Sequence, residues 1–309
     1  MANVAAPPLR PPGYSLLIAA REVANEQGFR FDPYGIKWTP AACDNQIGPG
    51  PDTCDLTAQE DAFGSSISPD VSDDCEEQTF KAIPLWAGYR VSAFSDDVDY
   101  QAEVTILDNG EPSRPLSGNE RKALDRLAAT ESFQLAKELW AGAVAVAANP
   151  DLPNNYFAKA GSSSVITGVQ GVPESVGVLD RELGECLFGV RGMVHVTPRL
   201  LASWVANSVV TRVGNLWVTP IGNVVVADAG YPGTAPSGSS SLNPNYEWAF
   251  ATGMVDVRLD AVQFLRGPGS FHRRTNTYEL RAQRLGAAYF DPCCVLAVQV
   301  DPCADPCGT

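Results

Sequence analysis

The segment from Thr275 to Val300, TNTYELRAQRLGAAYFDPCCVLAVQV, constrains the fold of this chain more than any other stretch. Asn276 to Arg281 alternates sides in the manner of a strand, and the small, basic stretch from Arg281 to Ala288 follows it. Asp291-Pro292 predicts a turn, and Val295 to Val300 predicts a closing apolar strand. This segment is therefore predicted to consist mainly of β-structure.

The composition is compatible with a subunit that faces other subunits. Only 19% of the 309 residues are charged, whereas 45% are hydrophobic. An ordinary globular protein with many small residues has the same composition, so this observation leaves both interpretations open. The 27 glycines and 24 prolines favour turns and extended segments.

The charge balance argues against broad binding to a nucleic-acid duplex. The chain carries 22 Lys and Arg against 36 Asp and Glu, which gives a formal net charge of -14. Leu16 to Ala20 is too short to span a membrane, and it lacks the flanking features of a signal peptide. We therefore expect a protein that is made and kept in the cytoplasm or released when the cell lyses.

The first part of the chain combines an arm, a helix and a long acidic loop. Met1 to Gly13 is proline-rich and predicts an extended arm, and Tyr14 to Gln27 has a helical pattern that Gly28 would end. Phe29 to Thr39 predicts a strand or extended segment. Between Pro40 and Gln78 acidic residues accumulate without any Lys or Arg, which predicts a long functional or inserted loop. Phe80 to Phe94 predicts the strand that returns from it.

A long amphipathic helix is predicted from Ser117 to about Ala148. Ser117 and Glu120 form a capping box at its start, and Asn149-Pro150 ends it. The expected charged positions off the apolar side include Glu131, and the expected apolar stripe consists of Leu124, Ala128, Leu135 and Leu139.

The middle of the chain predicts a compact α/β unit. Val165 to Val169 is a short strand, Pro173 to Leu187 a helix with its proline near the start, and Gly192 to Pro198 a buried strand. Pro198 opens a further helix that includes Trp204. Beyond it come a hairpin and two returning β-segments, in the ranges Leu216 to Thr219, Val224 to Ala227 and Glu247 to Leu265.

This order of segments resembles the major capsid proteins of tailed bacteriophages. Their shared architecture is the Hong Kong 97 fold, which encapsulin shells also use. The resemblance implies an α+β chain with an N-terminal arm, an extended loop, a long spine helix, a peripheral domain and an inserted axial α/β domain. The implied division is 1–28 for the arm, 29–95 for the extended loop region, 96–172 for the spine helix and first peripheral part, 173–231 for the axial domain, and 232–309 for a loop, the closing peripheral part and the C-terminal tail.

The resemblance implies a structural protein rather than an enzyme. Hexamers and pentamers of the chain would self-assemble into the icosahedral shell of a virion, formed in the host cytoplasm around a DNA genome that is enclosed without sequence-specific binding. Decoration or scaffolding proteins are further partners of such shells, and no cofactor or membrane is implied. Two alternatives stay open: an encapsulin-like nanocompartment shell and, from another class, a cytoplasmic α/β enzyme without a recognisable motif.

Eight cysteines allow either disulfides or free buried thiols. No export signal is seen, but a virion assembled in a reducing cell later meets an oxidising exterior. Adjacent Cys293 and Cys294 are poorly placed to pair with each other. The candidate disulfide-forming residues in the acidic loop and the tail are Cys43, Cys54, Cys75, Cys303 and Cys307.

Candidate catalytic and metal-binding residues are few. His195 lies in an apolar β-run with no carboxylate nearby in sequence, which favours a hydrogen-bonded core or edge residue over a general base. His272 belongs to a small basic cluster that favours a solvated or inter-subunit face. The acidic run Asp70 to Glu77 lacks the spacing of a calcium loop, and Cys303 and Cys307 lack the second ligand pair of a zinc site. We therefore predict no catalytic, cofactor or metal site.

Overall fold

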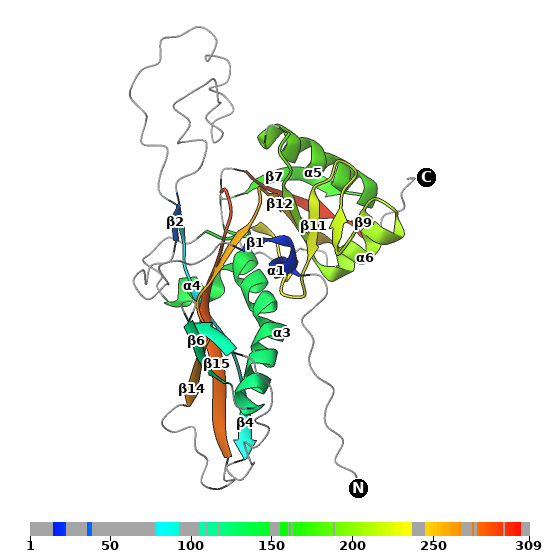
Figure 1. Cartoon of the computed structure of the whole chain (residues 1–309). Helices are drawn as coiled ribbons and strands as arrows, with labels where there is room; N and C mark the ends of the chain where they lie inside the picture. Colours follow the sequence, from blue (N-terminus) through cyan, green and yellow to red (C-terminus); the bar gives the residue numbers. More distant parts are fainter. Residues whose placement is uncertain are drawn as a thin grey trace, which may run out of the picture.

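The computed structural model describes residues 15–22, 36–38, 78–92, 105–108, 111–115, 118–148, 155–159, 161, 163–187, 189–236, 245–266, 274, 277–292 and 294–303. Figure 1 shows an elongated molecule in two parts. The long helix α3 (Gly118–Ala141) and the long strand β15 (Thr277–Tyr289) run side by side along one part. The helix α5 (Val172–Cys186) covers a sheet in the other part. Helices and mixed sheets together make this an α+β chain, as predicted.

The first part is built on a five-stranded sheet around β15. β4 (Ile83–Ser92) runs antiparallel along one edge of β15, while β13 (Asp256–Leu259) and β14 (Gln263–Arg266) share the other edge. The short strand β1 (Arg21–Glu22) extends the sheet beyond β13. The sequence predicted a strand followed by a small, basic stretch, whereas one continuous strand covers both.

The small residues of β15 are explained by their neighbours in this sheet. A Cβ atom on Gly286 would lie 2.6 Å from Leu85 Cδ1 and 3.1 Å from Leu259 Cδ2. Ala282 and Ala287 are also buried, so larger side chains at these positions would collide with the core. Smallness in this stretch therefore reflects tight packing within a strand.

The helix α3 packs lengthwise on β4 and β15 through a stripe that is partly out of phase with the predicted one. Leu135 and Leu139 are buried as predicted, but Leu124 and Ala128 are only half-buried. The buried positions in that half of the helix lie one residue earlier in each case, at Ala123 and Leu127.

Glu131 corrects the prediction that it would lie off the packed side. Its carboxylate accepts hydrogen bonds from Arg284 Nε at 3.0 Å and Arg284 Nη2 at 2.5 Å. Both side chains are largely buried between α3 and β15. A bidentate partner on the facing strand thus allows a charged residue to occupy the packed face of the helix.

The long helix ends at Ala141, seven residues earlier than Ala148, which was the predicted end. Gly142 adopts a left-handed backbone with φ of 63°, and the separate helix α4 (Ala143–Ala148) follows. The Glu138 carboxylate accepts hydrogen bonds from the backbone N–H groups of Val144 and Ala145, both at 2.8 Å. The break is therefore built in, because a side chain of α3 supplies the cap for the next helix.

A seven-stranded sheet forms the second part. Its strand order is β7-β16-β12-β8-β11-β10-β9, with β8 parallel to β11 and antiparallel to β12. The strand bounds are Ser164–Gln170 for β7, Met193–Val196 for β8, Thr211–Val213 for β9, Leu216–Val218 for β10, Val224–Ala227 for β11, Glu247–Thr252 for β12 and Val295–Val300 for β16.

The two faces of this sheet pack against different partners. Val194 and Val196 of β8 belong to a core with α5 and α6 (Pro198–Ala206), whereas Met193 faces the core that contains α3. Thr197 caps α6, since its hydroxyl accepts a hydrogen bond from Leu200 N at 3.1 Å. The sheet therefore lies between the α5–α6 pair and the end of α3.

The seven-stranded sheet is built from segments that lie far apart in the sequence. The middle α/β unit was expected within residues 173–231, and its sheet also contains β7, β12 and β16. The domain boundaries themselves stay a prediction. The range Glu247 to Leu265 holds three strands rather than the two that were predicted, because β14 follows β13.

The predicted helix from Tyr14 to Gln27 is wrong as far as the described residues reach. Only α1 (Leu16–Ala19) is helical, and the chain becomes extended at Ala20. Arg21 then donates its backbone N–H to Val255 O at 3.0 Å, and its guanidinium pairs with Asp256. The chain pairs with the edge of β13 instead of continuing as a helix. Short-range periodicity does not reveal this pairing, because β13 is distant in sequence.

The ends of the predicted acidic loop meet in the structure. β2 (Ile36–Trp38) pairs antiparallel with β3 (Gln78–Phe80), and β4 begins shortly afterwards. The acidic residues between them, and Ser117 of the expected capping box, lie outside the described residues. A separate hairpin consists of β5 (Thr105–Asp108) and β6 (Glu111–Pro115).

Candidate functional site

His195 lies fully buried on β8 with a hydroxyl at each ring nitrogen. Its Nε2 is 3.0 Å from Thr252 Oγ1, and its Nδ1 is 2.9 Å from the hydroxyl of Tyr231. Thr252 donates its hydroxyl proton to Gly253 O at 2.8 Å, so it accepts from Nε2–H, and Nδ1 accepts from Tyr231. Burial lowers the pKa of His195 to about 3. This confirms the prediction that His195 is a hydrogen-bonded core residue.

Tyr231 is held in its protonated form by the same surroundings. Burial, and next the neighbouring Asp228 carboxylate, raise the pKa of Tyr231 well above its ordinary value. The phenol can therefore donate to His195 throughout the physiological pH range. His272 lies outside the described residues, so its basic cluster has no structural account.

Asp228 follows β11 and is buried at the interface between the two parts, where it contacts α3 and the start of α1. Its Oδ2 accepts hydrogen bonds from Ser132 Oγ at 2.9 Å and from Leu16 N at 3.2 Å, and its Oδ1 accepts from Gly230 N at 2.8 Å. These contacts tie β11 to α3 and to the start of α1. Both oxygens of the carboxylate are therefore engaged in contacts that hold these segments together.

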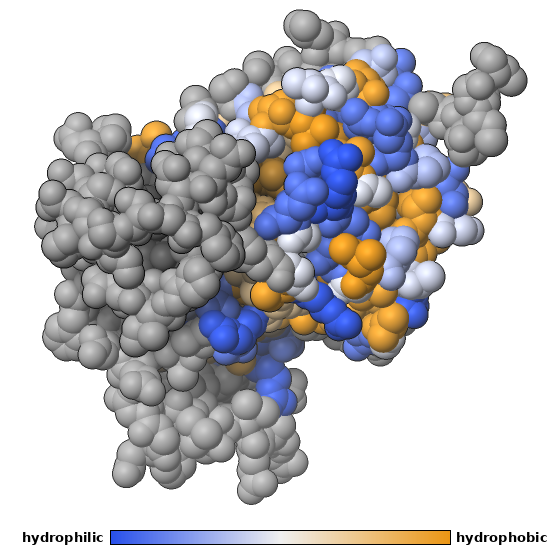
Figure 2. Space-filling view, turned by 90° about the horizontal axis from the view of Figure 1, so that it is seen from above, coloured by the Kyte–Doolittle hydropathy of each residue, from blue (hydrophilic) through white to orange (hydrophobic). Residues whose placement is uncertain are grey.

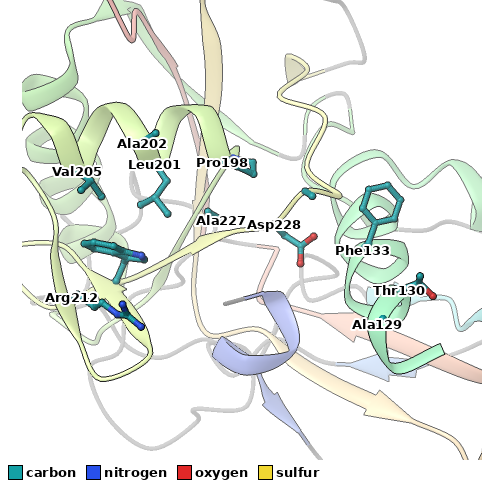
Figure 3. A pocket seen from close by; sticks show the side chains of 12 residues that line it. Ala129, Thr130, Phe133, Pro198, Leu201, Ala202, Val205, Arg212, Ala227 and Asp228 are labelled. Atoms are coloured by element: carbon teal, nitrogen blue, oxygen red, sulfur yellow. The ribbon is translucent and has the colours of Figure 1, made fainter. Parts of the chain in front are cut away.

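A groove opens beside Asp228. It has a volume of about 880 Å³ and lies between α3, α6 and the β9–β10 hairpin (Figure 3). We call it the α3–α6 groove. Its walls are mainly apolar, and the side chains that characterise it are Phe133, Leu201, Val205, Trp217 and, at its polar positions, Arg212 and Asp228.

The groove was not predicted from the sequence. Phe133 stands off the apolar stripe of α3 and is 44% exposed, and Val205 on α6 is 37% exposed. A large apolar residue off the packed side of an amphipathic helix was the available signal. The chemistry of the lining suits burial of an apolar segment with few polar contacts.

The described residues contain one disulfide, and it joins two cysteines that were not among the predicted candidates. Cys186 on α5 and Cys294 before β16 form a disulfide with a Cα–Cα distance of 5.9 Å, and neither was among the candidates. Cys303 is exposed and free in the structure. The remaining candidates, Cys43, Cys54, Cys75 and Cys307, lie outside the described residues, so their pairing stays a prediction.

The described ranges contain neither a cluster of metal-ligating side chains nor a membrane-spanning helix. Within them, no three His, Cys, Asp or Glu side chains lie close enough together to hold a metal ion. The acidic run from Asp70 to Glu77 lies outside these ranges. None of the helices in the described part of the chain is long and apolar enough to span a bilayer.

Exposed apolar side chains are distributed over several elements rather than gathered in one face. Figure 2, which views the molecule from above, shows apolar groups separated by hydrophilic ones. The large exposed hydrophobic residues among those described are Ile18, Trp86, Phe133, Val144, Val146, Val165, Val169, Val190, Val205, Val213, Ile221, Met254 and Leu265. Exposed apolar residues that are scattered singly are normal on protein surfaces and do not by themselves mark an interaction site.

Comparison with known proteins finds similar structures but no similar sequence. No protein-family model and no curated protein sequence matches this chain. The holo-SrpI encapsulin complex from Synechococcus elongatus is similar with a TM-score of 0.51 and 10% identity, over 95% of this chain and 90% of that chain. The capsid of an empty GTA particle (12% identity, 97% and 94% coverage) and that of the Gordonia phage Cozz (11% identity, 99% and 92% coverage) each reach a TM-score of 0.49.

The similarity to the encapsulin covers nearly the whole length of both chains. It includes the long helix against β15 and the α/β unit beyond it, which are the elements that the resemblance required. The chain therefore has the Hong Kong 97 type of fold, as predicted from its segment order. At 10% identity the similarity establishes the fold, and function has to be inferred separately.

Proposed function

We propose that this chain is the structural subunit of a protein shell and assembles with many copies of itself. The observation that carries the proposal is its Hong Kong 97 type of fold, which matches an encapsulin subunit over 95% of the chain.

We further propose that the shell is the capsid of a tailed bacteriophage. In this proposal, hexamers and pentamers enclose a DNA genome, and assembly takes place in the host cytoplasm before the virion is released. The net charge of -14 supports enclosure without adhesion, because like charge keeps the shell from gripping the phosphate backbone. Decoration or scaffolding proteins are further proposed partners.

Within this proposal, the elements take the roles of a capsid subunit. We assign α3 as the spine helix and the sheet around β15 as the peripheral domain. The α/β unit with α5, α6 and the hairpin is assigned as the axial domain, and residues 29–95 as the extended loop region. The role is structural rather than catalytic, which agrees with the engaged state of His195 and Asp228.

An encapsulin-type compartment is the second candidate, favoured by the similarity to the SrpI encapsulin complex. Such a shell would enclose protein cargo instead of a genome. A cytoplasmic α/β enzyme is the competitor from another class, and it would form a small oligomer with a substrate in the α3–α6 groove.

The contents of purified particles test the proposal. Particles from the native source should be treated with nuclease, disrupted, and analysed for protected nucleic acid and for co-purifying proteins. The capsid proposal expects DNA of one uniform, genome-like length. A stoichiometric cargo enzyme without protected DNA would establish the encapsulin alternative, and the absence of any particle would overturn both shell functions.

A further inference from the structure

We propose that the α3–α6 groove is the docking site for the proline-rich arm of the same chain, Met1 to Gly13. The occupant is a segment outside the described residues, and it joins the described chain beside the groove. The inference goes beyond the shell function, because it concerns how each subunit covers its own apolar surface.

The first support is that the groove is open and apolar. Phe133 on α3 is 44% exposed and Val205 on α6 is 37% exposed, although both line a cavity of about 880 Å³. Figure 3 shows the residues of α6 and those of α3 on opposite sides of this space. Large apolar side chains in a concave site are those that a docked apolar segment would remove from water.

The second support is the position at which the described chain starts. Ser15 lines a small cavity together with Leu201, Trp217 and Ala227, and these three residues also line the α3–α6 groove. Leu16 N donates to Asp228 Oδ2, which lies in the wall of the same groove. The arm therefore joins α1 next to the groove, and the backbone of Ser15 is extended, with φ of -165° and ψ of 173°.

The third support is the composition of the arm. Its sequence, MANVAAPPLRPPG, contains two proline pairs and a single charged side chain, Arg10. Such a segment favours the polyproline II conformation and would span roughly 40 Å at about 3.1 Å per residue. Proline-rich segments dock into grooves lined by aromatic side chains, and Phe133 and Trp217 supply these here.

The attachment point favours the arm of the same chain over that of a neighbour. A tethered segment meets an adjacent site at an effective concentration in roughly the millimolar range. The same segment on another copy has this advantage only after assembly. The groove is therefore expected to be occupied in the unassembled subunit as well as in the shell.

Photocrosslinking of the full chain tests the proposal. The variant Phe133→p-benzoyl-L-phenylalanine places a photoreactive group in the groove wall, and mass spectrometry then identifies the crosslinked peptides. The matched control is Trp86→p-benzoyl-L-phenylalanine, because Trp86 is 46% exposed on β4 and is not part of the groove lining. Subunits labelled with heavy nitrogen are mixed with unlabelled ones before irradiation, so that crosslinks within one chain and between chains differ in mass.

The expected result is a crosslink from position 133 to residues 1–13 within single-isotope species, and none from position 86. Mixed-isotope crosslinks would show that a neighbour's arm occupies the groove and would overturn the assignment to the same chain. No crosslink to residues 1–13 in either species would overturn docking altogether. Because the readout applies to unassembled subunits, it is independent of shell formation.

Hydrogen exchange gives a second readout that does not require a modified residue. Deletion of residues 2–13 should accelerate amide exchange in α6 and around Phe133 by about tenfold, while the central strand β12 keeps its protection. Addition of a synthetic peptide with the arm sequence should restore protection in α6. Unchanged exchange in α6 after the deletion would contradict the proposal.

Discussion

His195 on β8 is buried in the core, where its side chain lies between Thr252 of β12 and Tyr231. Both ring nitrogens of the neutral imidazole are hydrogen-bonded. Protonation would require Nδ1 to donate, yet the Tyr231 hydroxyl that faces it is positioned to donate as well. Phe157 and Tyr231 surround the imidazole ring closely. A charged imidazolium is therefore strongly disfavoured at this position.

Acidification should destabilise the subunit through His195. The pKa of His195 is about 3 in the folded chain, against about 6.5 in an unfolded one. As the pH falls below about 6.5 the unfolded chain binds a proton that the folded chain cannot, so the free energy of unfolding falls by about 1.4 kcal/mol per pH unit. The His195→Gln variant should lose less stability than the natural chain between pH 7 and pH 5, by about 2 kcal/mol.

The measurement is the urea midpoint of both chains at a series of pH values. His195→Gln is expected to be less stable than the natural chain at pH 7, since one hydrogen bond is altered, but to have a flatter pH dependence. Parallel curves for the two chains would show that His195 can accept a proton in the folded state.

The fold also requires glycine at position 142. Its backbone has φ of 63°, and a Cβ atom there would lie 2.2 Å from Tyr156 Cδ1. Gly177 in α5 offers the contrast, because it lies inside a helix and an added Cβ would meet no atom within 4 Å.

The two glycines should therefore respond in opposite directions to alanine. Gly142→Ala is expected to destabilise the subunit by about 2–4 kcal/mol, from the left-handed backbone and the displaced Tyr156 ring together. Gly177→Ala should stabilise it by about 0.5–1 kcal/mol. Calorimetric melting of the two variants beside the natural chain distinguishes them, and equal shifts of both would refute the break between α3 and α4.

Single residues were predictable from sequence where their neighbours along the chain decide their role. His195 could be placed in the core because it interrupts an apolar β-run. Glu131 could not be placed on the packed face, since its partner Arg284 lies on a distant strand. The pairing of Cys186 with Cys294 was missed for the same reason, because 108 positions separate them.

At the scale of elements, the disulfide ties α5 to the sheet at the start of β16. Cys294 is buried in the core shared by α5 and α6, and Cys186 lies in the last turn of α5. The bond closes a long stretch of chain, so it restricts the unfolded state considerably. It would form after the subunit has folded and met an oxidising environment.

Loss of this disulfide should be measurable as a loss of stability in air-oxidised protein. Cys186→Ser is expected to lower the free energy of unfolding by about 5 kcal/mol, as the loop-closure relation gives for a loop of this length. Treatment with reductant should bring the natural chain close to the variant. Cys303→Ser is the matched control and should change nothing, because Cys303 is exposed and free.

Labelling of free thiols can contradict the prediction that Cys186 and Cys294 are joined by a disulfide. If alkylation of native, air-oxidised protein modifies both Cys186 and Cys294, the bond is absent and the stability argument fails. Labelling of Cys303 in the same sample confirms that the reagent has access to free thiols.

Elements were predictable where local pattern and packing agree. The strand β8, the helix α5 and the hairpin β10–β11 lie where their apolar periodicity and turn residues indicated. The stretch at Arg21–Glu22 has a helical pattern but pairs with β13, and the helix predicted to Ala148 breaks at Gly142. At Arg21 the pairing with β13, a distant segment, decides the backbone, and sequence periodicity does not reveal it. At Gly142 the break depends on a left-handed glycine and on the Glu138 carboxylate that caps the next helix, and apolar periodicity does not reveal these either.

At the scale of the whole molecule, the chain returns repeatedly to the same two sheets. β16 lies between β7 and β12, and β15 receives β4 from nearly two hundred residues earlier in the chain. The order of segments was readable from sequence and pointed to the Hong Kong 97 fold. The strand order within each sheet was not, because it depends on long-range pairings.

The acidic loop is expected to act between subunits rather than within one. Because β2 and β3 hold its ends together, deletion of Asp44 to Glu76 should leave a folded subunit with an unchanged circular dichroism spectrum. The deleted chain should nevertheless fail to build stable shells, since the loop has too few hydrophobic residues to fold on its own and needs a neighbour or internal cysteine pairing for its order. If electron microscopy shows normal particles from the deletion variant, the loop is not required for shell assembly.

Self-assembly into a closed shell is the central claim, and electron cryomicroscopy of the purified full chain tests it most directly. The chain should be imaged as purified and again after incubation in buffers of several ionic strengths. Sedimentation velocity should be measured on the same samples. We predict closed icosahedral particles of megadalton mass in which α3 and β15 run along the shell wall and the α5–α6 unit gathers around the symmetry axes. A homogeneous monomer or dimer under every condition, with no particle or ring-shaped capsomer, would contradict it.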